Sequence, residues 1–192
     1  MSTEDKYPNW FAVTAQHNFE KHLLKYAGRE CLQYLQVGAF TGDASVWLAK
    51  NVLTGNLCNV LDIDTWKGSK EEQHEVMDFA DVYKTYKEKT APYSNIIKSA
   101  IGDSSVYIQE LKQRYHFIYI DGDHTTVGVI LDAELGWQRL FSGGIMAFDD
   151  YNWGSNLPLH LRPRPGIDLF LLRHDGEYEL LEKNEQLWIR KS

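Results

Sequence analysis

The sequence predicts an α/β fold, a doubly wound and mostly parallel sheet with helices on both faces. Apolar runs of strand length alternate along the chain with segments of helical periodicity, which is typical of a parallel sheet. Glycine or aspartate follows most of the apolar runs, as expected where the strands of such a sheet end in loops. No repeat or linker interrupts the alternation. We therefore expect a single domain over residues 1–192, with a helical extension at 1–30 and the core at 31–192.

The first part of the chain is expected to form a helix and then a strand–helix–strand unit. Apolar residues recur at near-helical spacing over Thr14–Ala27, and Gly28 stands where this helix would end. The runs CLQYLQV at 31–37 and LCNVLDI at 57–63 predict short buried strands. Between them, after the loop GAFTGD, a helix is expected over about 44–53.

The middle of the chain continues this alternation. The charged stretch 67–91 is helical in composition, with an expected inward stripe of Val76, Phe79, Val82 and Tyr86. Three more strands are expected at NIIKSAI, FIYID and GIMAFDD, and two more helices at SSVYIQELKQRY and VGVILDAELGWQRLF. The buried side of the last helix is expected to carry Val127, Ile130, Leu131, Leu135 and Leu140.

The C-terminal part changes character. A loop rich in proline and arginine precedes a short helix near 166–174. The runs YELLE and QLWIRK then flank a turn at Lys183 and Asn184, which predicts an antiparallel hairpin.

The composition and the cysteine usage favour a cytoplasmic protein that does not bind nucleic acid. A formal charge of −7 at pH 7 and the lack of a basic stripe disfavour binding to nucleic acid. Cys31 and Cys58 lie outside any CxxC motif and are expected to be reduced core residues. The N-terminus does not resemble a signal peptide, and no run of about 18 apolar residues predicts a membrane span. The sequence does not specify the oligomeric state, so a homodimer remains an open alternative.

Polar residues follow five of the expected strands. Because the strands of a parallel sheet end at one edge, where ligands bind, these residues are expected to converge on a single rim. They are Gly38 to Gly42, Asp64, Gly102 to Ser104, Asp121 to His124, and Asp149 with Asp150.

The first three of these loops suggest a nucleoside site, although each also has a simpler explanation. Gly38 and Gly42 fit close approach to a cofactor or merely a tight strand-to-helix turn. Asp64, 22 residues after Gly42, is placed to accept both ribose hydroxyls, but capping or solvation also accounts for it. Asp103 and Ser104 would equally well cap the next helix.

Three carboxylates end the fourth and fifth strands. Asp121 directly follows the apolar run FIYI, and a buried carboxylate needs a partner such as a donor, a cation or a metal. Asp149 and Asp150 are expected beside it, where three like charges would repel one another. A hard divalent ion held by oxygen ligands would relieve the repulsion, and a water-filled acidic cleft is the alternative.

Several segments together resemble class I S-adenosylmethionine-dependent methyltransferases. They are LQVGAFTGDASVWL, LDIDTWKG, IGDSSVYIQEL, FIYIDGDHTTVGVILDAELGW, GGIMAFDDYNW, RPRPGIDLFL and QLWIRK. The resemblance is to the small-molecule O-methyltransferase branch with IDG-x-H and FDDY strand ends, as in macrocin-type enzymes, and it runs from about Gln33 to the C-terminus.

The resemblance implies a Rossmann-like, seven-stranded sheet with one antiparallel strand, S-adenosyl-L-methionine as the cofactor, and Mg²⁺ or another divalent cation as a further cofactor. The cofactor-binding residues it implies are Gly38, Phe40, Gly42, Ser45, Asp64, Trp66, Gly102, Asp103, Ser104, Asp121 and His124. The metal ligands it implies are Asp121, Asp149 and Asp150. The chain departs from the family pattern at Gln36, where an acid is usual, at Asp123, where a small residue is commoner, and in having no lysine that matches the base of plant-type enzymes.

The chemistry of methyl transfer assigns roles to two rim residues. Displacement at a sulfonium is in line, so the protein mainly has to align the acceptor with the methyl carbon. An acceptor hydroxyl is a poor nucleophile until its proton leaves, which a divalent ion or a histidine can promote. His124, close to Asp121 in sequence, is the rim histidine placed for this task. We expect His124 and Asp121 to be catalytic, with a structural or cofactor contact as the alternative for His124.

Two other functions are considered. An NAD(P)-dependent oxidoreductase would hold its pyrophosphate at a glycine loop, but GAFTGD departs from GxGxxG and would bring Asp43 to the phosphates. A non-catalytic nucleoside-binding protein remains open, although it would not require clustered acids.

The acceptor is not specified by the sequence, and a sugar, a phenol and a natural-product intermediate all remain open. Candidates for its pocket are Trp10 and Phe11, the stretch 67–91, and the loop 151–165 with Trp153, His160, Arg162 and Arg164.

Overall fold

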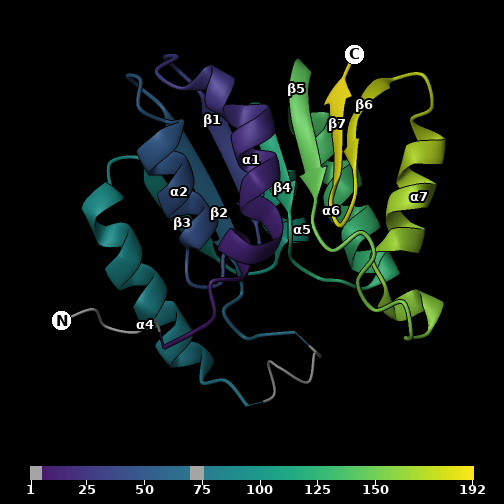
Figure 1. Ribbon diagram of the computed structural model, residues 1–192, viewed down its shortest axis with the longest axis horizontal. Helices are drawn as coiled ribbons and strands as arrows, with labels where there is room; N and C mark the ends of the chain where they lie inside the picture. Colours follow the sequence, from purple (N-terminus) through teal and green to yellow (C-terminus); the bar gives the residue numbers. More distant parts are fainter. Residues whose placement is uncertain (1–5, 70–75) are drawn as a thin grey trace.

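Seven strands form one sheet in the computed structural model, which describes residues 6–69 and 76–192 (Figure 1). The strand order is β3-β2-β1-β4-β5-β7-β6. The strands are β1 Gln33–Val37, β2 Asn59–Asp64, β3 Ile97–Ile101, β4 Tyr115–Ile120, β5 Leu140–Phe148, β6 Tyr178–Lys183 and β7 Leu187–Lys191. β1 to β5 pair in parallel, whereas β7 is antiparallel to both of its neighbours. The predicted fold class, with its C-terminal hairpin, is confirmed.

Helices cover both faces of the sheet. α1 (Gln16–Leu23), α2 (Asp43–Asn51) and α4 (Phe79–Thr90) pack on one face. α5 (Ser104–Glu110), α6 (Thr126–Arg139) and α7 (Arg164–Arg173) pack on the other. Figure 1 shows α1 and α2 in front of the sheet and α5 and α6 behind it. Short helical turns lie at Phe11–Ala15, Leu24–Tyr26, Ala91–Tyr93 and Leu159–Leu161.

The central strand β4 shows how one apolar run supplies two cores. Successive side chains of a strand point to opposite faces. Phe117 and Tyr119 join the core under α1, where the ring of Phe19 lies 5.5 and 5.0 Å from theirs. Ile118 and Ile120 join the core under α6. Burial on both faces explains why this strand lacks polar alternation in the sequence.

The predicted buried side of α6 is only partly correct, because Ile130 and Leu135 pack against the core whereas Val127 and Leu131 do not. Val127 and Leu131 are exposed, Ile130 and Leu135 are half-buried, and Leu140 opens β5. The side that packs on the sheet carries Val129, Ala133, Gly136 and Trp137. Gly136 allows close approach, because a Cβ there would lie 3.2 Å from the Met146 side chain. Small residues therefore determine which side of α6 is buried.

The helix predicted at SSVYIQELKQRY is shorter than expected. α5 ends at Glu110, since Leu111 adopts an extended backbone. Tyr115 is fully buried as the first residue of β4 and pairs with Leu140. Burial of this aromatic ring in the sheet outweighs the helical propensity of the segment before it.

Two smaller expectations also fail. Val76 is 87% exposed and precedes α4, whose N-cap is Asp78, whereas Phe79, Val82 and Tyr86 do face the core. Residues 70–75 of the predicted 67–91 stretch lie outside the described residues. Cys31 is exposed because it occupies a turn with φ of 60°, while Cys58 is buried as expected.

No helix within residues 6–69 and 76–192 combines the length and the hydropathy that a membrane crossing requires.

Phe19→Ala should lower the free energy of unfolding by about 3–5 kcal/mol, because it removes a fully buried ring and leaves a cavity between α1 and the sheet. Urea unfolding followed by circular dichroism measures the change. His17→Ala, on the exposed side of the same helix, is the matched control and should change stability by less than about 0.5 kcal/mol. A similar small effect for both variants would contradict this account of how α1 is held.

Candidate active site

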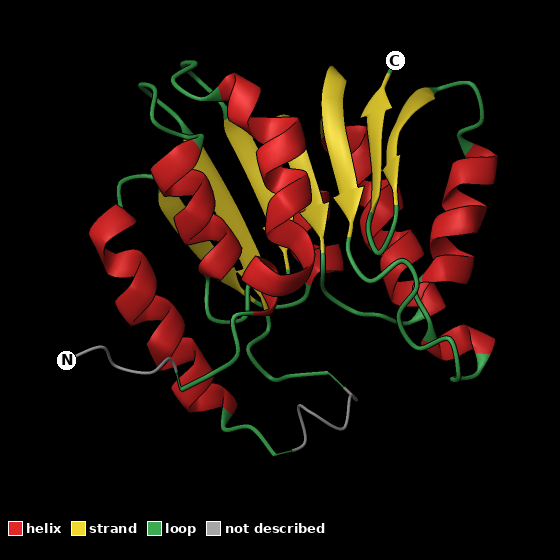
Figure 2. Ribbon diagram, viewed as in Figure 1, coloured by secondary structure: helices red, strands yellow, loops and turns green. Residues whose placement is uncertain are grey.

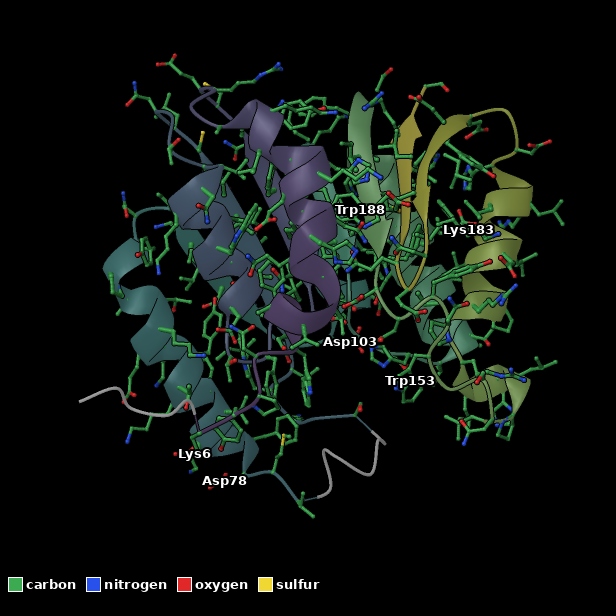
Figure 3. All side chains as sticks on the ribbon, in the orientation of Figure 1. Lys6, Asp78, Asp103, Trp153, Lys183 and Trp188 are labelled. Atoms are coloured by element: carbon green, nitrogen blue, oxygen red, sulfur yellow. The ribbon has the colours of Figure 1, made fainter. Side chains whose placement is uncertain are left out.

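The five parallel strands end at a cleft of about 930 Å³. The loops that follow them gather at one edge of the sheet, at the bottom of the view in Figure 2. Asp103 and Trp153, both of which line the cleft, lie toward this edge in Figure 3. The other residues that the sequence predicts for the site and that also line the cleft are Gly38, Phe40, Asp64, Trp66, Gly102, Ser104, Asp121, His124, Asp149 and Asp150. Gly42 and Ser45 are predicted site residues that do not line it.

The loop after β1 depends on a glycine. Gly38 has φ of +80°, and a Cβ there would lie 1.9 Å from the backbone oxygen of Asp121. Gly42 also has a positive φ and opens α2, where a Cβ would lie 2.9 Å from the ring of Tyr86. Neither position accepts another residue without strain.

Asp64 fixes the shape of this loop. Its Oδ2 accepts hydrogen bonds from the backbone N–H of Ala39 at 2.7 Å and of Phe40 at 3.0 Å. Its Oδ1 accepts from the backbone N–H of Trp66 at 2.7 Å, and the Trp66 indole donates to the backbone oxygen of Phe40 at 2.9 Å. A carboxylate has about four acceptor sites, and because three are used here, about one remains for a ligand hydroxyl.

Beneath the loop lies a buried carboxyl that sequence reasoning missed. Asp62 accepts hydrogen bonds from the hydroxyl of Ser45 at 2.6 Å and the hydroxyl of Tyr86 at 2.7 Å. Burial raises its pKa from 3.8 to about 7, and the charge of Asp64 adds to this. The Ser45 hydroxyl also lies 3.0 Å from the side-chain oxygen of Gln36, and the Gln36 amide donates to the backbone oxygen of Gly38. The aspartate at position 62, inside the apolar run LDID, is the feature of the sequence that could have predicted this buried carboxyl.

The loop after β3 is tied to its neighbours in a similar way. Gly102 donates its N–H to the backbone oxygen of Asp64 at 2.9 Å. Asp103 caps α5 by accepting from the Ser105 hydroxyl and backbone N–H, which lowers the pKa of its carboxyl. The Ser104 hydroxyl donates to Asp132 of α6 at 2.6 Å. Burial raises the pKa of Asp132 to about 7.

The ends of β4 and β5 bring a histidine and two carboxylates together. His124 Nε2 lies 3.2 Å from Asp150 Oδ2 and 3.6 Å from Asp121 Oδ1. Burial and the charge of Asp149 raise the pKa of Asp121 well above its usual value, although its hydrogen bond with His124 acts in the opposite direction. The ring of Trp153 meets the His124 ring edge-on at 5.1 Å.

This group could hold a cation. One ligand atom from each of Asp121, His124 and Asp150 lies within 4.8 Å of the others. Two carboxylate oxygens and an imidazole nitrogen are ordinary ligands of divalent metals.

Asp149 is turned toward the sheet interior and is not part of this group. Its Oδ2 accepts from the Tyr119 hydroxyl at 2.5 Å, and its Oδ1 accepts from the Gln186 amide at 2.9 Å. Gln186 is fully buried and also accepts from Asn18 of α1 at 2.8 Å and from the Trp188 indole at 2.9 Å. The side chain of Asp149 is thus held by hydrogen bonds that reach the N-terminal helix.

The candidate acceptor residues divide into two sets. Trp10, Phe11 and Trp153 line the cleft. His160, Arg162 and Arg164 do not.

The order of the strands and the cleft at their ends define a Rossmann-like α/β protein. Residues 35–151, more than half of the chain, match the family described as "Methyltransferase domain", and the chain belongs to this family. No curated protein matches the sequence at a significant level.

Solved structures share the fold at low identity. An O-methyltransferase from Bacillus cereus in complex with S-adenosylhomocysteine (SAH) is 19% identical, with a TM-score of 0.58 over 83% of this chain and 74% of that one. The O-methyltransferase TomG from Streptomyces achromogenes, in complex with S-adenosylmethionine (SAM), is 13% identical, with a TM-score of 0.63 over 88% and 75%. An rRNA methylase from Streptococcus thermophilus is 12% identical, with a TM-score of 0.60 over 92% and 93%.

Asp62→Asn should flatten the pH dependence of stability. Between pH 4 and pH 7 the folded protein keeps the proton of Asp62 while the unfolded chain has released it, so the free energy of unfolding falls as the pH rises. Asparagine can accept from one of the two hydroxyls, Ser45 or Tyr86, and donate to the other, and it does not titrate. At pH 8 the free energy of unfolding of the variant should therefore exceed that of the parent, by up to about 1.4 kcal/mol for each unit of pKa shift removed.

Urea unfolding at pH 5 and pH 8 measures this difference. The control is Asp103→Asn, because a lowered pKa changes stability only as the pH falls through the acid range. An unchanged slope between pH 5 and pH 8 in Asp62→Asn would contradict the protonated state of this carboxyl.

Proposed function

We propose that this protein transfers the methyl group of SAM to a hydroxyl of a small molecule. The observation that carries the proposal is a single cleft that joins the loop framed by Gly38 and Asp64 to the group of Asp121, His124 and Asp150. Membership of the methyltransferase family supports methyl transfer. The complexes of similar structures with SAM and SAH support the cofactor.

The cofactor would lie across the ends of β1, β2 and β3. We assign the methionine part to Gly38 and Phe40, the ribose to Asp64 with Trp66 beside it, and the adenine to the loop of Gly102, Asp103 and Ser104. Gly42 and Ser45 would act indirectly, because they shape the loop and do not line the cleft. The positive sulfonium is favoured by the carboxylates around the cleft.

His124 would accept the proton of the acceptor hydroxyl. Its Nε2 lies 3.2 Å from Asp150, and negative charge on that carboxylate would stabilise the imidazolium that forms. Asp121 would also lie beside the reacting methyl group, because its backbone abuts Gly38 on the cofactor side of the cleft.

Asp121 and Asp150 are the residues that would hold a divalent ion. A bound ion would lower the pKa of the acceptor hydroxyl. Asp149, the third ligand implied by family resemblance, already accepts from Tyr119 and Gln186. We propose that it orients this side of the cleft and does not bind the ion directly.

The two other functions have less support. A nicotinamide dinucleotide would bring its pyrophosphate to the loop after β1, where Asp43 and Asp64 line the cleft. A protein that only binds nucleosides would not need the grouping of His124 with two carboxylates.

SAH should stabilise the folded protein by mass action, by about 2.7 kcal/mol at 100 times its Kd, and NADH should not. Asp64→Asn should weaken SAH binding by about 10- to 100-fold, because it removes a charged acceptor for the ribose. Calorimetry measures the affinities, with the exposed Asp175→Asn as control. Stabilisation by NADH together with none by SAH would refute the proposed cofactor.

His124→Ala should lower single-turnover methyl transfer by on the order of 10²–10⁴-fold while leaving SAH affinity nearly unchanged, since it removes only the proton acceptor. Asp121→Asn should lower both the rate of methyl transfer and the affinity for SAH, because Asp121 would lie beside the cofactor as well as the acceptor. Normal turnover by His124→Ala would remove the histidine from the mechanism. Full activity of the parent in excess chelator would exclude a metal ion from the mechanism and leave His124 as the proposed base.

A further inference from the structure

The two ends of the cleft differ in chemistry. The end below β1 to β3 carries the loops assigned to the cofactor. The opposite end, below β4 and β5, is lined by Asp121, Asp123, Asp149 and Asp150. It also has an apolar lining from Trp153, Leu157 and Leu161, and Trp10 and Phe11 line the same cleft beside Phe40. This second end is called the acceptor end below.

As long as no metal ion is bound at Asp121 and Asp150, the described residues of the acceptor end offer no cation to an anionic ligand. Among the described residues that line the whole cleft, Lys67 is the only lysine or arginine, and it follows β2 on the cofactor side. Arg162 donates to the backbone oxygen of Ser155. Arg164 lies over the ring of Tyr151 and 3.6 Å from Asp168. Both arginines of this loop are therefore engaged outside the cleft.

Charge therefore discriminates strongly among acceptors. Two like charges 4 Å apart repel by about 4 kcal/mol at the effective dielectric of a protein surface. A carboxylate or phosphate that entered the acceptor end would meet several aspartates without a compensating cation. A neutral group would avoid this repulsion, and an ammonium group would be attracted.

Two indole rings give the acceptor end a flat apolar lining. Trp153 is half-buried, and its edge-on contact with His124 at 5.1 Å places it beside the proposed base. Trp10 is also half-buried and packs against Phe40, with the ring centroids 4.8 Å apart and the planes inclined by 30°. Faces of this kind favour planar rings, and they also attract cations.

We propose that the acceptor is a planar hydroxylated ring compound, neutral or cationic, that lies against Trp153 beside His124, and that anionic acceptors, RNA among them, are excluded. This inference rests on the proposed function. In the reaction the acceptor O–H bond breaks and its proton passes to His124. The oxygen forms a bond to the methyl carbon as the carbon–sulfur bond breaks, and the electron pair of that bond stays on sulfur to give SAH.

A series of matched acceptors tests the charge rule. 3-Hydroxybenzyl alcohol, 3-hydroxybenzylamine and 3-hydroxybenzoate share one ring and differ in charge, and the corresponding 6-substituted 2-naphthols form a larger trio. 3-(Hydroxymethyl)cyclohexanol tests planarity, and an rRNA fragment tests the nucleic-acid alternative. With methyl-labelled SAM, kcat/KM for the neutral and cationic ring compounds should exceed that of the carboxylates by at least about tenfold.

Two variants at Trp153 test the location. Trp153→Leu should raise KM for the ring compounds, because the ring that contacts them is lost. Trp153→Arg should in addition shift the ratio of kcat/KM toward the carboxylates by on the order of tenfold, because it supplies the missing cation. Phe141→Leu, an aromatic substitution outside the cleft lining, should leave the ratio unchanged.

Several outcomes would overturn the inference. They are preference for a carboxylate or for RNA, equal use of the saturated alcohol, no shift of the ratio in Trp153→Arg, and SAH binding without turnover of any compound in the series. In each of these cases SAM as the methyl donor survives, although preference for RNA would also refute the small-molecule acceptor of the proposed function. Absence of SAH binding would instead refute the proposed function itself.

Discussion

The site depends on a close approach between two backbones. Gly38 at the end of β1 meets the backbone oxygen of Asp121 at the end of β4, so closely that no side chain fits between them. These are the adjacent strands at which the strand order reverses. From here one loop runs to α2 on the first face of the sheet, and the other runs to α6 on the opposite face. The crevice that opens where the two loops diverge is the general ligand site of such sheets, and the cleft lies there.

Below the cleft, carboxyl–hydroxyl pairs attach helices to strand β2 on one face of the sheet and to a neighbouring helix on the other. Ser45 and Tyr86 connect α2 and α4 to Asp62 on the first face. On the second face Ser104 connects α5 to Asp132 of α6. Burial raises the pKa of both aspartates to about 7, so each holds its proton over much of the range in which an exposed aspartate is ionised. Only a hydrogen-bonded and largely uncharged carboxyl is tolerated at such depth.

The sequence predicts the strands, the shared rim and most of the cleft residues, because these follow from the alternation of short apolar runs with polar endings. It could not predict which side of α6 is buried, since the packing of Gly136 depends on where Met146 lies in the folded chain. Nor could it show that Asp149 and Asp150, adjacent in sequence, have different partners. That difference arises from Gln186, which is far away along the chain and reaches Asp149 only in the assembled sheet.

The hydrogen bond between Asn18 and Gln186 joins residues 168 positions apart in the sequence. Asn18 belongs to the helix that follows Trp10 and Phe11, and Gln186 precedes the last strand of the sheet. During synthesis on the ribosome, α1 emerges early but cannot make this contact until the final hairpin has left the exit tunnel. This hydrogen bond therefore forms only after the last strands of the sheet have been translated, and until then α1 of a nascent chain has only its contacts with earlier elements, such as that of Phe19 with β4.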